Sequence, residues 1–211
     1  MAAPQRIILA RHGVTDFTAS ERWDGRGGAD PGLNADGRAQ ADDLAARFAT
    51  YFADVDVSRV ISSSLSRARQ TAEPVASVIG RPVDPDPAWD ELAFGEWDGR
   101  SWPELRADHP NDVERFMYDE TFRVPGGESH VDLHARVRPA FERLLQSGET
   151  VLVVSHWGPI MSVLSLLLGI DLGPARRLML APTSLSSVVM GTIGPRVEFV
   201  NDLGTRGVLH P

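Results

Sequence analysis

Two segments of the chain place a histidine directly after a short apolar run. Ile7–Ala10 is followed by Arg11 and His12, and Thr150–Ser155 is followed by His156. Apolar runs of this length predict buried strands. In α/β sheets, ligands bind beyond the carboxyl ends of the strands, where the following loops present their side chains. We therefore expect His12 and His156 to meet at one site.

Two further polar side chains are candidates for the same site. The run Val57–Ser62 predicts a third strand that leads into Arg67, and Glu91 lies in the stretch Trp89–Trp97, which is flanked by apolar residues. A compact cationic pocket would form if Arg11, Arg67 and the two histidines came together. Such a pocket suits the oxygens of a phosphoryl group, because a guanidinium group can donate two parallel hydrogen bonds to them.

These residue types predict a two-step phosphoryl transfer. A neutral imidazole can attack phosphorus and form a covalent intermediate. Electrostatic stabilisation and positioning then carry most of the catalysis. A carboxyl group with a raised pKa can protonate the leaving alkoxide and later take a proton from water. This chemistry requires no metal and no cofactor, and its partner is a small phosphorylated metabolite.

The composition excludes several other classes of protein. All 21 basic residues are arginines, so a Walker-type phosphate loop and a Schiff-base enzyme, which both need lysine, are excluded. There is no cysteine, which excludes thiol nucleophiles, thiolate metal sites and disulfides. The net charge of −8 argues against a nucleic-acid partner, which usually faces a basic stripe.

The length and the apolar segments indicate one soluble domain. The chain has 211 residues, no internal repeat and no linker, so we expect a single domain over 1–211. The apolar run in residues 1–10 is too short for a signal peptide. Residues 157–170 are interrupted by Gly158, Pro159 and serines, and fall short of a membrane span. We expect a cytoplasmic protein with no membrane partner.

Strand patterns alternate with helix patterns along the chain. This alternation predicts an α/β protein, in which helices cover both faces of a sheet as a three-layer α/β/α sandwich. Gly194 and Pro195 predict the turn between the last two strands. The expected helices are 35–52, which begins after Asn34, 65–79, 129–146 and 158–168; the expected strands are 7–10, 57–62, 150–155, 186–190 and 197–200.

Residues 81–128 have a different character. They are rich in proline and carry only short helix patterns, around 101–107 and 111–119. We interpret this stretch as a lid-like insertion that covers one end of the sheet. Variable loops on a fixed scaffold usually determine specificity, so we expect the lid to select the substrate.

Five motifs follow one another along the chain: LARHG at 9–13, SSSLSRARQTA at 62–72, ELAFGEWDG at 91–99, PGGES at 125–129 and VVSHWGPI at 153–160. In type and order they resemble the motifs of the histidine phosphatase superfamily, also called the phosphoglycerate mutase-like family. The resemblance extends over roughly residues 5–203 and implies the phosphoglycerate mutase-like fold. Residues 25–41 are similar to the phosphatase branch, namely to alpha-ribazole phosphatases and to the acid-phosphatase domain of actinobacterial ribonuclease H fusions.

The resemblance also implies a role for each residue of the site. His12 would be the nucleophile that becomes phosphohistidine. Arg11, Arg67 and His156 would hold the phosphoryl oxygens, and Glu91 would be the proton donor and then the base.

Other residues are candidates for substrate binding. Thr18 lies where many members have an asparagine that reaches the phosphate, and Trp157 would narrow the pocket or stack on the substrate. Arg26 is a candidate for binding the part of the substrate outside the phosphate. His130 and His134 have the spacing of helical metal ligands, but no third ligand is evident, so we interpret them as a solvated or half-buried helix face.

The sequence leaves several functions open. A phosphatase passes the phosphoryl group to water, whereas a phosphoglycerate mutase returns it to the product. The absence of lysine and of large insertions favours hydrolysis. The residues implied by the resemblance are all present, which disfavours a non-catalytic phosphate-binding relative. Few clustered ligands are present for a metal-dependent hydrolase. A homodimer is common among relatives, but no sequence pattern here requires one.

Overall fold

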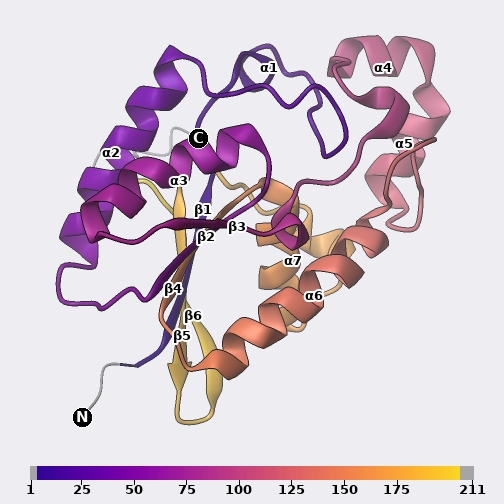
Figure 1. Ribbon diagram of the computed structural model, residues 1–211. Coiled ribbons are helices and arrows are strands. Elements are labelled where there is room, and N and C mark those ends of the chain that lie inside the picture. Colours follow the sequence, from indigo (N-terminus) through magenta and orange to yellow (C-terminus); the bar gives the residue numbers. More distant parts are fainter. Residues whose placement is uncertain (1–3, 205–211) are drawn as a thin grey trace.

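The computed structural model describes residues 4–204 and contains a six-stranded sheet with helices on both faces (Figure 1). The predicted α/β/α sandwich is therefore confirmed. The strand order is β3-β2-β4-β1-β5-β6. The strands are β1 (Arg6–Arg11), β2 (Arg59–Ser62), β3 (Val83–Pro85), β4 (Val151–Ser155), β5 (Leu185–Gly191) and β6 (Gly194–Asp202).

The centre of the sheet determines where the two histidines lie. β1 and β4 are parallel neighbours, and Arg11 pairs with Ser155 at the end of the ladder. His12 and His156 directly follow these two residues, and the His12 amide donates to the Ser155 carbonyl at 2.9 Å. Parallel pairing therefore brings residues that are far apart in the sequence to the same edge of the sheet.

Helices α2 and α3 cover one face of the sheet, and α6 and α7 cover the other. Within residues 4–204, no helix is both long and apolar enough to cross a membrane. The helices are α1 (Asp16–Ala19), α2 (Ala35–Tyr51), α3 (Ser66–Ile79), α4 (Trp102–Asp108), α5 (Pro110–Tyr118), α6 (His130–Ser147), α7 (Trp157–Leu168) and α8 (Leu172–Ala175), with short 3₁₀ helices η1 (Pro87–Trp89) and η2 (Gly95–Trp97).

Alternation along the central strands divides the core into two clusters. Ile8 and Leu152 pack with the residues of α2 and α3. Ile7 and Val153 pack with α6, α7 and the segment that follows β3. All four side chains are fully buried. Neighbouring residues of a strand point to opposite faces, so a sheet buried on both faces needs a continuous apolar run, as both predicted strands have.

Capping residues define the ends of the long helices. Asn34 accepts a hydrogen bond from the Gly37 amide at the start of α2, as its sequence position predicts. Ser129 and Asp132 form a capping box at the start of α6. α6 ends at Gly148, whose φ of 73° is a left-handed conformation that glycine adopts without a steric penalty.

Two expectations about chain segments were wrong in detail. The short strand β3 lies inside the expected insertion 81–128, so the part outside the sheet begins only after Pro85. The turn between β5 and β6 lies at residues 192–193, because Gly191 pairs with Gly194 and Pro195 pairs with Met190. β6 is an edge strand, where a residue without an amide proton is tolerated.

Candidate active site

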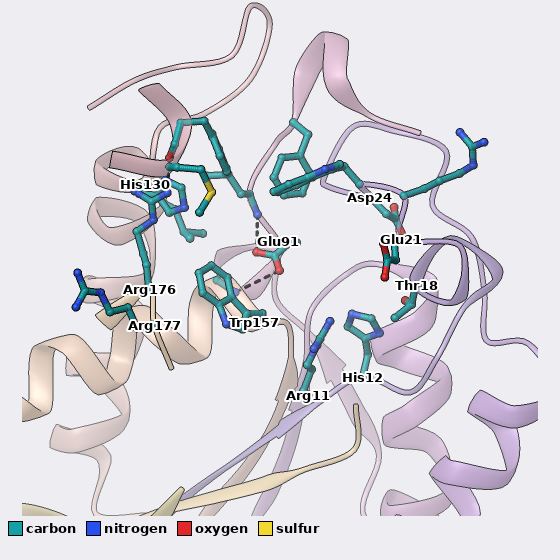
Figure 2. Close-up of a pocket in the computed structure, with 18 of the residues that line it drawn as sticks. Arg11, His12, Thr18, Glu21, Asp24, Glu91, His130, Trp157, Arg176 and Arg177 are labelled. Atoms are coloured by element: carbon teal, nitrogen blue, oxygen red, sulfur yellow. Dashed lines mark hydrogen bonds between the residues drawn. The ribbon is translucent and has the colours of Figure 1, made fainter. Parts of the chain in front are cut away.

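The carboxyl ends of the central strands open into a cavity of about 840 Å³. In Figure 2, Arg11 and His12 lie at its base and Glu91 lies above them. Six of the predicted residues line this cavity: Arg11, His12, Thr18, Arg67, Glu91 and Trp157. His156 and Arg26 are not among the lining residues.

His12 has the protonation state that a nucleophile requires. Its Nδ1 lies 2.7 Å from the carbonyl oxygen of Gly13, so Nδ1 carries the proton and donates it. Burial lowers the pKa of His12 well below its ordinary value, and the guanidinium groups of Arg67 and Arg11 lower it further. The imidazole is therefore neutral near pH 7, and the lone pair of Nε2 is available for attack.

Arg11 lies beside His12 and is held in place by the backbone. Its Nη1 donates to the carbonyl oxygen of Leu180 at 2.6 Å. Its Nε is buried and has no hydrogen-bond partner among residues 4–204. Burial lowers the pKa of Arg11, while the carboxyl group of Glu91 raises it. The guanidinium group thus keeps unused donor capacity next to His12.

Arg67 is engaged by a carboxylate that the sequence analysis did not single out. The Arg67 side chain is 1% exposed, and its Nη1 forms an ion pair with Asp24 Oδ2 at 2.8 Å. Its Nη2 donates to the carbonyl oxygen of Asp24 at 2.9 Å. Asp24 therefore lies against the guanidinium group that a phosphoryl group would approach.

The charge of Asp24 changes near neutral pH. Burial raises the pKa of Asp24 to about 7; Arg67 opposes this shift, while Asp98, Asp30 and Glu91 increase it. Asp24 therefore loses its proton within the range in which most enzymes are assayed.

Glu91 is buried opposite His12. Its Oε1 accepts from the Leu92 amide at 2.9 Å, and its Oε2 accepts from the Gly158 amide at 3.2 Å. Burial raises the pKa of Glu91 above its ordinary value, against the effect of these hydrogen bonds and of Arg67 and Arg11. A raised pKa suits a carboxyl group that donates a proton.

Gly158 allows Glu91 to approach the start of α7. A Cβ at position 158 would lie 2.3 Å from Glu91 Oε1 and 2.8 Å from a methyl group of Leu133. Only glycine permits the amide of residue 158 to contact the carboxylate in this arrangement.

Arg136 on α6 supports the segment that carries Glu91. It donates to the carbonyl oxygens of Ala88 at 3.1 Å, Asp90 at 2.9 Å and Glu91 at 3.3 Å. Its guanidinium group also pairs with Glu128 at 2.9 Å. Glu128 therefore anchors Arg136 and does not cap α6, a role that Ser129 fills.

His156 lies behind His12 and not on the cavity wall. It is fully buried, and its ring centroid is 4.9 Å from that of His12. Ser63 Oγ donates its only proton to Asp90 Oδ1 at 2.8 Å. In its contact with His156 Nε2, also at 2.8 Å, Ser63 Oγ must therefore accept, so Nε2 carries the proton. Burial lowers the pKa of His156 well below its ordinary value. Nδ1 is consequently unprotonated, and it has no partner among the described residues.

Of the remaining predicted residues, Thr18 and Trp157 line the cavity, whereas Arg26 does not. Thr18 lines the cavity, with its Oγ1 3.0 Å from Thr15 Oγ1. Trp157 also lines it, and its Nε1 donates to the Leu178 carbonyl at 2.9 Å, which fixes the ring. The structure does not bring Arg26 to the cavity, because its guanidinium group pairs with Glu128 at 3.7 Å.

His130 is a cavity residue that the sequence analysis interpreted wrongly as part of a solvated or half-buried helix face. It is 2% exposed and lines the cavity, and its ring lies 4.9 Å from that of Phe116. Burial, together with the smaller effect of the Arg176 charge, lowers the pKa of His130 to about 3. One signal could have revealed it: His130 lies on the helical face of Leu133 and Val137. His134 is half-buried, as expected.

Further cavity residues come from α5 and from the segment after α8. They include Phe116, Tyr118, Arg176 and Arg177. No motif marks them, because only the tertiary fold brings the two segments together. Within residues 4–204, no group of three or more His, Asp or Glu side chains is arranged to hold a metal ion.

Comparison with known proteins gave matches along most of the chain. Residues 7–203 match the family model of the histidine phosphatase superfamily (branch 1). The bifunctional protein Rv2228c of Mycobacterium tuberculosis is 36% identical over 204 residues, which are 95% of this chain and 55% of that protein. The chain thus spans about half the length of this relative. The probable phosphoglycerate mutase GpmB of Shigella boydii is 34% identical over 87% of this chain and 84% of its own.

Solved structures with phosphatase names have the same fold. The mycobacterial glucosyl-3-phosphoglycerate phosphatase Rv2419c in complex with VO3 has a TM-score of 0.82 and 26% identity, over 93% of this chain and 99% of its own. A putative alpha-ribazole-5'-P phosphatase from Escherichia coli has a TM-score of 0.83 and 25% identity, over 95% of this chain and 97% of its own.

Proposed function

The chain belongs to the histidine phosphatase superfamily (branch 1), and on this premise we propose that it hydrolyses a small phosphomonoester through a phosphohistidine at His12. The observation that carries the proposal is the state of His12. Its Nδ1 donates to a carbonyl oxygen, which leaves Nε2 with a lone pair beside Arg11 and Arg67.

In the first step, Nε2 of His12 attacks phosphorus, and the bond between phosphorus and the ester oxygen breaks. The electron pair of that bond goes to the leaving oxygen, which takes the proton of Glu91. Arg11 and Arg67 offset the charge on the phosphoryl oxygens. For Arg67 to do so, its guanidinium group must exchange part of its contact with Asp24 for contact with the substrate.

In the second step, the Glu91 carboxylate takes a proton from water, and the water oxygen attacks phosphorus. The bond between phosphorus and Nε2 breaks, and inorganic phosphate leaves a neutral His12. The reaction uses only side chains of this chain and needs no metal or cofactor.

The names of the relatives support a small phosphorylated metabolite as the substrate class. Two of the structures are of phosphatases named for glucosyl-3-phosphoglycerate and alpha-ribazole-5'-P. One relative is named as a probable phosphoglycerate mutase, which makes return of the phosphoryl group to the product the second candidate function. Release of inorganic phosphate when water is the only phosphoryl acceptor present separates hydrolysis from this transfer.

The test measures phosphate release from p-nitrophenyl phosphate in excess chelator. The native protein should be active, and His12→Ala should reduce kcat by about a thousandfold or more, because the nucleophile is lost. His134→Ala is the matched control, since His134 is a half-buried histidine outside the cavity lining. Activity retained in His12→Ala, or abolished by the chelator, contradicts the proposal.

A further inference from the structure

The cavity is much larger than a phosphoryl group requires, so part of it is available to the leaving group. The cavity has a volume of about 840 Å³, which lies within the usual range for sites of small organic ligands. In Figure 2, His130, Arg176 and Arg177 lie on one side of Glu91, whereas Thr18, Glu21 and Asp24 lie on the other.

Arg176 is a partly desolvated cation without an ion pair among residues 4–204. Its Nη2 donates to the carbonyl oxygen of Phe116, and its guanidinium carbon lies 5.5 Å from the centre of the Phe116 ring. Burial lowers the pKa of Arg176, and Glu120, which is too distant for an ion pair, raises it. The side chain is therefore held in place by the lid without being neutralised, a state that costs free energy unless an anion compensates it.

Arg177 adds a second positive charge at the same wall. It is exposed and lines the cavity, and it makes no ion pair within the described part of the chain. Two neighbouring guanidinium groups at one wall match the geometry of carboxylate and phosphate groups.

His130 contributes an unused polar atom to this region. Its side chain is buried between the rings of Phe116 and Trp157, at centroid distances of 4.9 Å and 6.5 Å. Its Nδ1 is buried and has no hydrogen-bond partner within residues 4–204. Native proteins leave few buried polar atoms unpaired, so His130 Nδ1 is a candidate for a hydrogen bond to a bound ligand.

We propose that His130, Arg176 and Arg177 form a second anion subsite, which binds a carboxylate or a second phosphate on the leaving group. The proposal rests on the proposed function, because it assigns the phosphoryl end to His12. The ligand class is thus a phosphomonoester with another acidic group, whose carbon skeleton passes Phe116 and Trp157.

Two acidic residues on the opposite wall of the cavity would orient the substrate. Glu21 and Asp24 line the opposite wall and repel an anionic leaving group from that side. A substrate with two acidic groups would therefore be oriented with its phosphoryl group at His12 and its second anion at Arg177. Repulsion on one side and attraction on the other together increase selectivity.

The test compares three matched substrate series of increasing chain length: alkyl phosphates, ω-carboxyalkyl phosphates and alkanediol bisphosphates. At one chain length, kcat/KM for an acidic series should exceed that for the alkyl series by about tenfold or more. The acidic series that shows the gain identifies the second anion as carboxylate or phosphate. Equal kcat/KM values in all three series overturn the proposal.

The variant that tests the subsite is Arg177→Gln. Arg177 is exposed, so its loss should leave folding intact. The ratio of kcat/KM for the acidic substrate to that for the alkyl substrate should fall by about tenfold, mainly through KM. Arg143→Gln is the matched control, because Arg143 is exposed on α6 outside the cavity lining. An unchanged ratio in Arg177→Gln contradicts the subsite.

A binding measurement separates failure of the subsite from failure of the proposed hydrolysis. Alkanediol bisphosphonates and alkylphosphonates cannot be hydrolysed, and their Kd values can be measured by calorimetry whether or not the protein turns over. Tighter binding of the bisphosphonate, lost in Arg177→Gln, supports the subsite even if no phosphate is released. Equal Kd values for both compounds overturn it even if hydrolysis is observed.

Discussion

At the residue scale, the protonation of Asp24 changes the charge beside Arg67. The Asp24 carboxylate lies 2.8 Å from Nη1 of Arg67. The negative charges of Asp30, Asp98 and Glu91 raise the pKa of this carboxylate. Its pKa is raised to about 7, so it is mostly protonated at pH 6 and mostly ionised at pH 8. The ionised form pairs with Arg67 and repels a phosphate dianion. Substrate binding should therefore weaken as the pH rises through 7.

We predict that Asp24→Asn lowers KM at pH 8 by about three- to tenfold, because the variant removes the repulsion between the Asp24 carboxylate and the phosphate of the substrate. At pH 5.5, where native Asp24 is already protonated, the variant and the native protein should have similar KM values. The measurement is KM for p-nitrophenyl phosphate between pH 5.5 and pH 8. Asp36→Asn, an exposed carboxylate on α2, is the control. The same pH dependence in native protein and Asp24→Asn would disprove the role of Asp24.

Glu91 gives a second prediction at this scale. Glu91→Gln removes the acidic proton, so kcat on alkyl phosphates should fall by about 10²- to 10⁴-fold. The fall should be much smaller for p-nitrophenyl phosphate, because its leaving group departs without protonation. Glu91 accepts from two amides, and the amide group of glutamine can replace only one acceptor, so Tm is measured to check the fold. Equal losses on both substrates would show that Glu91 is not the acid.

At the scale of elements, α6 positions the segment that carries Glu91. Arg136 donates to the carbonyl oxygens of Ala88, Asp90 and Glu91, and Glu128 holds its guanidinium group. Glu91 is thus placed by hydrogen bonds from a helix, although its segment contains only short 3₁₀ turns. Such supporting hydrogen bonds restrict the conformations of the segment, which a precisely positioned side chain requires.

We predict that Arg136→Gln reduces kcat by about tenfold with little change in KM, since the acid is displaced and the phosphate ligands remain. The pH at which kcat declines on the alkaline side should also shift, because the surroundings of Glu91 change. Arg143→Gln on the same helix should alter neither value. A reduced Tm with an unchanged alkaline limb would indicate that Arg136 only stabilises the fold.

The elements with long apolar patterns could be predicted from the sequence. The run 150–155 gives β4, and Asn34 marks the start of α2, because both signals are local. β3 has only three residues, of which two are exposed, so its sequence shows no hydrophobic periodicity that would predict a strand. Gly194 and Pro195 have turn composition, but pairing with β5 decides their conformation. Tertiary pairing overrides local preference at such positions.

The candidate site follows the same division. His12, Arg11 and Arg67 can be placed because they follow predicted strands, and Glu91 because apolar residues flank it. The motifs add only the roles implied by the resemblance, and these stay predictions. Asp24 and Arg177 lie in loops that only the fold brings to the cavity. The position of His130 on the helical face of Leu133 and Val137 indicates that it is buried, but no local pattern shows that this face borders a cavity.

At the scale of the whole molecule, the tryptophans report on only one half of the core. Trp89 and Trp97 belong to the cluster beneath the cavity, and Trp23, Trp102 and Trp157 pack against it. The cluster under α2 and α3 contains none of them. Tryptophan fluorescence therefore follows the side of the sheet that carries the lid, whereas circular dichroism follows the whole chain.

We predict that Leu44→Ala, which removes a fully buried side chain of α2, lowers stability by about 2–5 kcal/mol. Because the central strands belong to both clusters, the loss should shift the fluorescence and circular dichroism transitions by the same amount. Urea unfolding followed by both probes measures this. Separate transitions would show that the two faces of the sheet unfold independently.

The position of β1 in the sheet has a consequence for biosynthesis. Its partners are β4 and β5, so Arg6–Arg11 pairs only with strands that are translated much later. At ordinary rates of translation, the nascent chain carries this unpaired apolar segment for on the order of 10 s. During that time it is a target for chaperones and a source of aggregation. His12 is thus synthesised well before β4, and it reaches its place in the sheet only after β4 has left the ribosome.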